Sequence, residues 1–347
     1  MMKFLSMLVL CVLLLNGCQA ASPSPAATQP AAPPTEAPTK PVAPPTQPPP
    51  PTEAPAPAPT LPAVLQAAPR QDPPLKVAVD KDIAYTKPLQ AEITEKKMDI
   101  YRPEGAGPWP VIVVVPPLDN YRNTMTSQAL GKAIAGQGAV VFTPDIGSQA
   151  SYFIGQAAEN NGQVLRQTLE ETACALSFAK AKASDYAGNP ENIIVMGYSA
   201  GALYGLDLLL QGAEMGKSWD ALAAKRGGPP AQVQCVALLE EPVAVDGFVS
   251  FGGYFDVGEL RQIDPELAGI LDPLALAAGN PGMKVTLLFN LAKLADVPLE
   301  ATTALKDALA AVGHPVELFM VTPASGSISA KGPEVGWITN ALLQYAK

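Results

Sequence analysis

The sequence predicts an α/β protein, a doubly wound and mostly parallel sheet that follows a disordered, proline-rich tether. Two observations predict the sheet. Strand-like and helix-like runs alternate from about residue 98 to the end of the chain. Several strand-like runs are also continuously apolar and β-branched, which is typical of parallel strands covered on both faces. Because parallel neighbours need a crossover connection, this alternation indicates a doubly wound sheet.

Residues 1–20 are expected to be an export signal of the lipoprotein type. Lys3 precedes an apolar run from Phe4 to Leu15, which is too short for a permanent membrane span. The following Leu15-Asn16-Gly17-Cys18 resembles the lipobox of bacterial lipoproteins, in which the cysteine is lipidated. The alternative is an ordinary cleaved signal in which Cys18 is incidental. We therefore expect an exported protein that is anchored at the bacterial cell envelope only through a lipid on Cys18.

Residues 21–75 are expected to form the tether. They consist mainly of Pro, Ala, Thr, Gln and Ser and contain too few large apolar side chains to fold. Residues 76–347 are then long enough for one large α/β domain. The formal net charge of -9 argues against nucleic acid or an anionic membrane surface as a partner.

The domain contains two cysteines, Cys174 and Cys235. Export permits a disulfide, but Cys174 lies in an apolar helical pattern, so two separate buried thiols are the favoured interpretation. No cluster of Cys, His and carboxylate residues predicts a metal site, and nothing in the sequence calls for a cofactor.

The elements follow in regular order along the domain. Strands are expected at 98–103, 111–115, 139–145, 193–196, 248–254, 284–289 and 316–321, and helices at 127–137, 163–182, 200–211, 302–311 and 335–345. Ligands of such sheets bind beyond the carboxyl ends of the strands. Functional residues are therefore expected just after each strand.

The run Gly197-Tyr198-Ser199-Ala200-Gly201 joins a buried strand to a helix. A Gly-x-Ser-x-Gly run in this position forms a turn so tight that glycine is needed on both sides of the serine, whose oxygen is left exposed at the sheet edge. The sequence thus predicts Ser199 to be a nucleophile. The backbone N–H of Ala200, at the helix start, is one expected donor to an oxyanion. Pro116 and Pro117 lack an N–H, so Leu118 is the first available second donor.

A family resemblance rests on this motif and on the segments that surround it. Asp99–Pro103, Pro144-Asp145, Asn189–Ile193, Gly197–Ala202 and Pro315–Leu318 occur in an order that resembles α/β-hydrolases of the esterase, lipase and dienelactone-hydrolase type. The resemblance covers the chain from about residue 90 to the end. It implies hydrolysis of a carboxylic ester or a related acyl bond in a small-molecule ligand.

The resemblance also implies a histidine in the loop after the last strand, to take the proton of the serine. Residues 322–332 hold no histidine, and the one histidine of the chain, His314, precedes that strand. Six strand residues at about 3.3 Å each place it roughly 20 Å from the edge that carries Ser199, so we expect a turn residue there. Lys331 or a water held by a carboxylate is the expected substitute base.

Two aspartates are candidates for the acid of the site. Asp296 is displaced by two residues from the position that the family pattern implies, and a solvated loop charge is its alternative. Asp256 follows the strand at 248–254, and its alternative is a helix N-cap.

Two functions remain open at this point. The intact Gly-x-Ser-x-Gly run favours a serine hydrolase, whereas the missing imidazole favours a catalytically impaired hydrolase fold that binds a ligand or a partner. The sequence specifies neither the substrate nor an oligomeric state.

Overall fold

The computed structural model describes residues 65, 71–89, 94–117, 121–148, 159–227, 231, 233–239, 242–293, 297–323 and 328–347, all within the compact unit Pro57–Lys347. The expected export signal with Cys18 and the expected tether as far as residue 64 lie outside the described residues. Among the residues that are described, no helix has both the length and the apolar character needed to cross a membrane.

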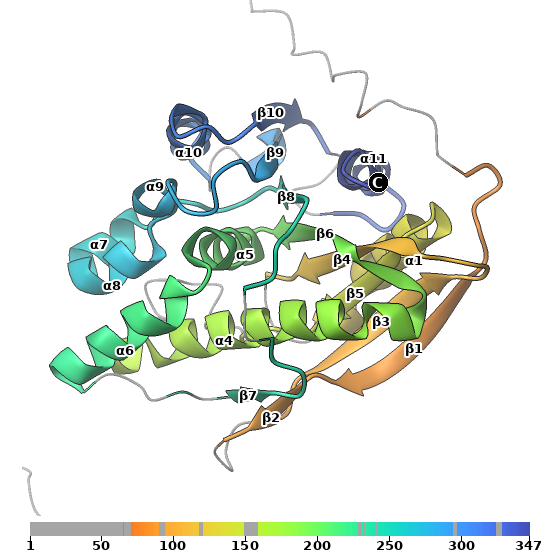
Figure 1. Cartoon of the computed structure of the whole chain (residues 1–347). Helices are drawn as coiled ribbons and strands as arrows, with labels where there is room; N and C mark the ends of the chain where they lie inside the picture. Colours follow the sequence, from red (N-terminus) through yellow and green to blue (C-terminus); the bar gives the residue numbers. More distant parts are fainter. Residues whose placement is uncertain are drawn as a thin grey trace, which may run out of the picture. The chain divides into compact units, whose positions relative to one another are not determined.

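An eight-stranded sheet forms the centre of the fold (Figure 1). Its spatial order is β1 (Val77–Ala84), β3 (Lys97–Pro103), β5 (Val140–Pro144), β4 (Trp109–Val115), β6 (Gly188–Tyr198), β8 (Gly247–Phe251), β9 (Lys284–Asn290) and β10 (Val316–Val321). Within this sheet the neighbours along β5, β4, β6, β8, β9 and β10 pair in parallel, whereas β3 pairs antiparallel with both β1 and β5. The mostly parallel, doubly wound sheet expected from the sequence is confirmed.

Helices cover both faces of the sheet. Helices α4 (Glu159–Lys182), α5 (Ala200–Gln211) and α10 (Leu299–Ala311) pack on one face, while α1 (Met125–Gly136) and α11 (Glu334–Leu343) pack on the other (Figure 1). The burial of β4 on both faces explains why its sequence is apolar throughout. Val113 points into the core beneath α4 and α5, and its neighbours Ile112 and Val114 point into the core beneath α1 and α11. Both sides of the strand are therefore dry.

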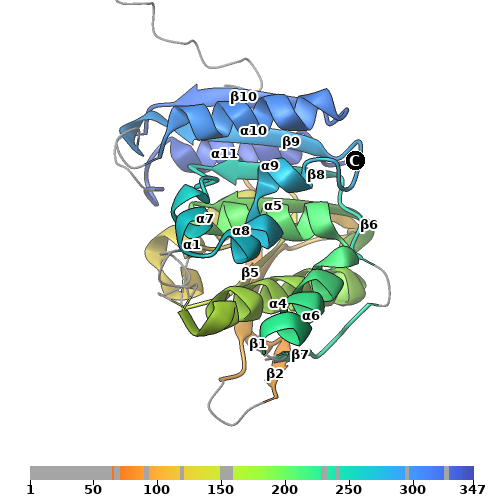
Figure 2. The same ribbon diagram turned by 90° about the vertical axis from the view of Figure 1, so that its left-hand side faces the viewer.

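Smaller elements complete the domain. Three 3-10 turns lie at Tyr121–Asn123 (η1), Ala183–Tyr186 (η2) and Leu291–Lys293 (η3). Helices α6 (Glu214–Arg226), α7 (Gly258–Ile263), α8 (Pro265–Leu271) and α9 (Pro273–Leu276) lie beside α5 (Figure 2). Helices α8 and α9 each begin at an Asp-Pro pair. The Asp264 and Asp272 carboxylates accept hydrogen bonds from the first turn, and each proline occupies the first helical position.

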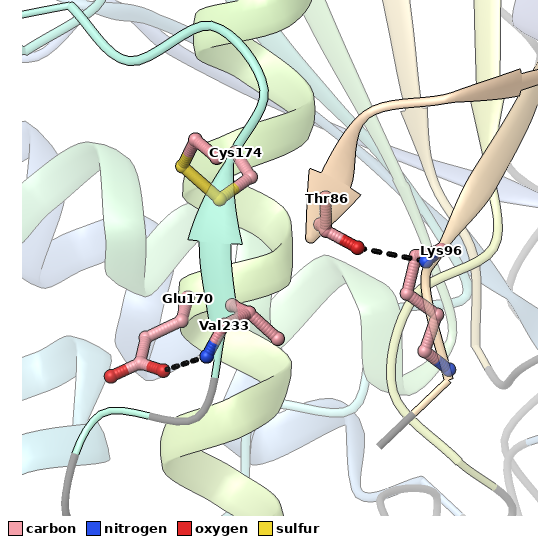
Figure 3. The surroundings of a disulfide bond; sticks show 6 residues. Thr86, Lys96, Glu170, Cys174 and Val233 are labelled. Atoms are coloured by element: carbon pink, nitrogen blue, oxygen red, sulfur yellow. Dashed lines mark hydrogen bonds between the residues drawn. A yellow bond between two sulfur atoms is a disulfide. The ribbon is translucent and has the colours of Figure 1, made fainter. Parts of the chain in front are cut away.

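A disulfide joins Cys174 of α4 to Cys235 of β7, so the expectation of two separate thiols is wrong (Figure 3). Strand β7 (Val233–Cys235) pairs with β2 (Thr86–Pro88) in a two-stranded sheet that lies against α4. This placement brings the Cα atoms of the two cysteines to 4.9 Å although 61 positions separate them in the chain. The apolar helical pattern around Cys174 indicated burial correctly, but it carried no information about the strand that lies on it.

Candidate active site

Ser199 stands where β6 ends and α5 begins, with backbone angles φ 51° and ψ −125°. A side chain in this region is strained, and such a conformation persists only when its surroundings impose it. The Ser199 N–H donates to the Phe251 carbonyl at 3.1 Å, and the Tyr254 N–H donates to the Ser199 carbonyl at 3.3 Å. The segment after β8 thus holds the serine in the turn.

The two glycines of the motif are required by close approach. A Cβ atom on Gly197 would lie 2.3 Å from the Ala202 Cα atom, and one on Gly201 would lie 2.3 Å from the Pro116 carbonyl oxygen. Neither contact is sterically possible. The Gly201 contact also shows that the segment after β4 borders the turn.

Ala200 is the first residue of α5, and its N–H therefore belongs to the group of helix-start donors that lack a partner within the helix. Together with the helix dipole, this N–H can stabilise negative charge beside Ser199. Leu118, the expected second donor, lies outside the described residues.

Tyrosines that the sequence analysis did not select surround the turn. The Tyr121 ring, in η1 after β4, contacts the Tyr198 ring with 5.8 Å between centroids. Tyr121 is buried, and its hydroxyl has no hydrogen-bond partner among the described residues. Burial, and next the proximity of Tyr198, raise the pKa of Tyr121, so its phenol stays neutral and able to donate. The sequence feature that could have identified Tyr121 as a candidate site residue was its position shortly after the end of β4.

An arginine fixes the segment that carries Tyr121. The Arg122 guanidinium donates to Asp145 at 2.6 Å, to Asp99 at 2.8 Å and to Asp82 at 2.9 Å. Asp82 and Asp99 belong to β1 and β3, and Asp145 follows β5. Four separate stretches of chain therefore meet at one buried cation beside the candidate site.

Of the two acid candidates, only Asp256 is described. Its Oδ1 atom accepts a hydrogen bond at 2.7 Å from the N–H of Gly258, the first residue of α7, but the N-cap residue of this helix is Val257, so Asp256 stands one residue before the N-cap position. Asp256 also lies two residues after Tyr254, which bonds the Ser199 backbone. Asp296 lies outside the described residues.

No hydrogen bond joins Lys331 to Ser199 in the described part of the chain. The Lys331 side chain is exposed, and the hydrogen bond at this residue runs from its backbone N–H to the Ser329 hydroxyl at 3.4 Å. Within the described part of the chain, neither the Lys331 ammonium group nor the Ser199 hydroxyl has a hydrogen-bond partner. In the same described part, no group of His, Cys, Asp and Glu residues is arranged to hold a metal ion.

His314 lies at the amino-terminal ends of the parallel strands, whereas Ser199 lies at their carboxyl ends, as expected from the place of His314 before β10. Strand register puts Tyr198 level with Phe251, Leu288 and Phe319, so Ser199 is about 20 Å from His314 along the strand direction alone. The imidazole is buried there, with its ring nitrogens 3.1 Å from the Met283 carbonyl and 2.9 Å from the Ala277 carbonyl. The His314 imidazole thus links the segment that precedes β9 to the turn that precedes β10.

The parallel sheet with helices on both faces, and the serine at a strained strand-to-helix turn, define an α/β-hydrolase fold. The model of the dienelactone hydrolase family matches residues 98–246. This match contains the Gly197–Gly201 run and ends just before β8.

Solved esterase structures share the fold. A bifunctional GH43-CE protein from Bacteroides eggerthii has a TM-score of 0.54 at 17% identity, over 77% of this chain and 38% of that one. Esterase B from Lactobacillus rhamnosis has a TM-score of 0.53 at 13% identity, over 77% of this chain and 85% of that one. Esterase Est2 from Thermogutta terrifontis has a TM-score of 0.50 at 16% identity, over 75% and 93%. No curated protein sequence matches the chain.

Proposed function

We propose that this protein is an ester hydrolase of the bacterial cell envelope whose nucleophile is Ser199. The observation that carries the proposal is the strained backbone of Ser199, held between two glycines that no other residue could replace. Such strain lowers stability and therefore calls for a purpose, and presenting a hydroxyl at the start of a helix is the purpose known for this fold. The dienelactone hydrolase match and the esterase neighbours support hydrolase chemistry.

The reaction follows from the arrangement. The Ser199 Oγ atom attacks the ester carbonyl carbon, and the oxyanion that forms accepts a hydrogen bond from the Ala200 N–H. Collapse of this intermediate releases the alcohol and leaves an acyl group on Ser199, which water then removes.

The proton of Ser199 needs an acceptor other than histidine. We assign this role to a water held by Asp256, since the segment of Asp256 adjoins the turn and its Oδ2 atom has no protein partner among the described residues. Lys331, exposed and without such a contact, is the weaker candidate. A water held by a carboxylate is a poorer base than imidazole, so slow turnover is expected.

The test is hydrolysis of short-chain p-nitrophenyl esters by the purified domain. The Ser199→Ala variant should lose about 10³-fold in kcat/KM, and Asp256→Asn should lose less and shift the pH profile. Ser218→Ala, on α6, is the matched control and should leave the rate unchanged. Equal rates for Ser199→Ala and the unaltered chain would refute the proposal.

A second candidate function has its own observation. The loop after β10 has no histidine at the position that the fold family uses, and the Ser199 hydroxyl has no partner in the described part of the chain. A chain of this kind could bind an ester without cleaving it. Saturable binding of a non-hydrolysable ether analogue, together with no turnover of the matching ester, would favour this function.

The envelope location is supported by two features. The first is the lipobox-like Leu15–Cys18, and the second is the Cys174–Cys235 disulfide, because such bonds persist mainly outside the reducing cytosol. In bacterial expression, Cys18→Ala should release the protein from the membrane fraction. Continued membrane association of this variant would exclude the lipid anchor.

A further inference from the structure

Gly147, two residues after Asp145 in the segment that follows β5, is held by two buried charged side chains. Its N–H donates to the Glu171 Oε2 atom at 2.6 Å, and its carbonyl accepts from the Lys96 Nζ atom at 2.6 Å. Gly147 has φ 70°, a left-handed conformation that favours glycine. Both backbone polar groups of this residue are therefore fixed by side chains from other elements.

The two charged side chains connect three parts of the fold. Glu171 lies on α4, is fully buried and also accepts from the Gln167 Nε2 atom at 2.7 Å. Lys96 comes just before β3, and its backbone N–H donates to the Thr86 hydroxyl of β2 (Figure 3). The Lys96 Nζ and Glu171 Oε2 atoms lie 3.8 Å apart. The pair thus joins α4 and the start of β3 to the segment after β5.

Stability alone does not account for a buried Lys–Glu pair. Both ions lose their hydration, and the attraction between them offsets this loss only in part, so an apolar pair of similar volume is often as stable. An apolar pair cannot supply directed hydrogen bonds to one residue. We therefore take the function of the Lys96–Glu171 pair to be the specific conformation of the segment around Gly147.

The segment after β5 lies close to the candidate active site. Strand register puts Phe142 of β5 level with Val195 of β6, on either side of β4. Three positions further along, Asp145 is level with Tyr198, and two strand spacings of about 4.8 Å place the two residues roughly 10 Å apart. Ser199 is the next residue in the chain, so the segment lies near the nucleophile without touching it.

Contacts lead from this segment to the serine turn. The Asp145 carboxylate accepts hydrogen bonds from the Arg122 guanidinium at 2.6 Å and from the Arg122 backbone N–H at 3.3 Å. Arg122 belongs to η1, and its neighbour Tyr121 packs against the ring of Tyr198. Because Asp145 is two residues from Gly147, a displacement of Gly147 would move the carboxylate that holds η1 beside the turn.

We propose that Lys96 and Glu171 are positioning residues of the ester site, which keep η1 in the place that ligand binding requires. The inference rests on the proposed function, since it concerns the same site. A pre-organised site binds its ligand more tightly because less conformational entropy is lost on binding. Loss of the pair should therefore weaken the binding of an ester.

The test variant is Lys96→Met with Glu171→Leu, which removes both hydrogen bonds to Gly147 and leaves neither charge of the pair buried alone. We expect the KM for p-nitrophenyl butyrate to rise at least about fivefold. The Kd of p-nitrophenyl butyl ether, which cannot be hydrolysed, should rise by the same factor. A role in stability alone would lower the folded fraction, and with it the apparent kcat, while KM stayed unchanged.

Two further variants separate positioning from general damage to the fold. Glu171→Gln keeps an acceptor for the Gly147 N–H, so its KM should stay within about twofold of that of the unaltered chain. Arg166→Met with Glu170→Leu is the matched control. It removes another buried ion pair of the same helix, whose arginine is bonded to Asp220 of α6, and it should leave KM unchanged.

The proposal is overturned if the Lys96 and Glu171 double variant binds both compounds as the unaltered chain does, or if the control raises KM equally. Hydrolysis by that double variant with an unchanged KM would leave the proposed function standing. If the unaltered chain binds the ether but hydrolyses no ester, the hydrolase function fails, and the Kd of the ether still decides the role of the pair. The absence of both turnover and binding would overturn both proposals.

Discussion

At the scale of single residues, Ser199 is strained because its neighbours leave no alternative. Helix α5 approaches the end of β4 so closely that Gly201 touches the Pro116 carbonyl, and Gly197 touches Ala202. These two glycines and the serine could be predicted from the sequence, since the motif itself encodes the steric need. Tyr121 and Arg122 could not, because their roles depend on partners that are distant in the chain.

Gly201→Ala should lower the free energy of unfolding by about 1–3 kcal/mol and reduce ester hydrolysis, because the new methyl group would push α5 away from Pro116. Urea denaturation and the p-nitrophenyl ester assay measure the two effects. Gly216→Ala is the matched control. It lies within α6, where an added Cβ would meet nothing within 4 Å, so this variant should be neutral or up to about 1 kcal/mol more stable. Equal behaviour of the two variants would contradict the steric account.

Asp207, fully buried in α5, makes stability depend on pH. Neither carboxylate oxygen has a hydrogen-bond partner in the described part of the chain. Burial, and next the charge of Asp272, raise the pKa of Asp207 well above 3.8. As the pH rises through the unfolded-state pKa, the unfolded chain releases this proton and the folded chain keeps it, so Asp207 lowers stability with rising pH.

Asp207→Asn should therefore be more stabilising, relative to the unaltered chain, at about pH 7 than at about pH 4. Urea denaturation at the two pH values measures the difference. A free-energy change that is the same at both would show that the carboxyl ionises equally in the folded and unfolded chains.

At the scale of elements, the central strands could be predicted from the sequence because they are buried on both faces. Strands β4, β5, β8 and β9, and the Ile193–Met196 part of β6, are almost wholly buried, and their sequences are mainly apolar as expected for strands covered on both faces. Strand β10 lies at one edge of the sheet and is only partly buried, yet its run of apolar residues still predicted it. The elements at the other edge and in the small sheet gave no such signal. Strand β1 contains Asp80, Lys81 and Asp82 and is half exposed, while β2 and β7 span only three residues each. The disulfide was misjudged for the same reason, since it depends on the place of β7.

Arg122 of η1 is paired with carboxylates of β1, of β3 and of the segment after β5, and its loss should be costly. Arg122→Met should lower the free energy of unfolding by about 3–5 kcal/mol, because Asp99, only 1% exposed, would keep a buried charge without its cation. Thermal denaturation of the variant measures this loss. Arg102→Met, which removes the arginine of a half-exposed pair with Asp80, is the control and should cost at most about 1 kcal/mol. Similar losses of unfolding free energy in the two variants would contradict the claim that burial makes the Arg122 ion pairs more important for stability than the Arg102 pair.

At the scale of the whole molecule, the length of the strands separates the Ser199 hydroxyl from the His314 imidazole. The parallel register places His314 and Ser199 at opposite ends of the strands, so His314 cannot accept the proton of Ser199 unless β10 unfolds. The order of strand and helix along the chain was sufficient to predict this separation. It was not sufficient to predict which group replaces the histidine, because that depends on how loops from different strands approach one another.

Ser199, if it is an activated nucleophile as proposed, reacts covalently with an ester-like inhibitor. An esterase with the same fold, from Lactobacillus rhamnosis, has been solved with a tributyrin phosphonate inhibitor, which recommends a phosphonate ester as the probe. Mass spectrometry after incubation with an alkyl p-nitrophenyl phosphonate should find one adduct, on the peptide that contains Ser199, and none in Ser199→Ala. If the folded protein remains unlabelled from acidic to alkaline pH, or is labelled at another residue, Ser199 is not the nucleophile.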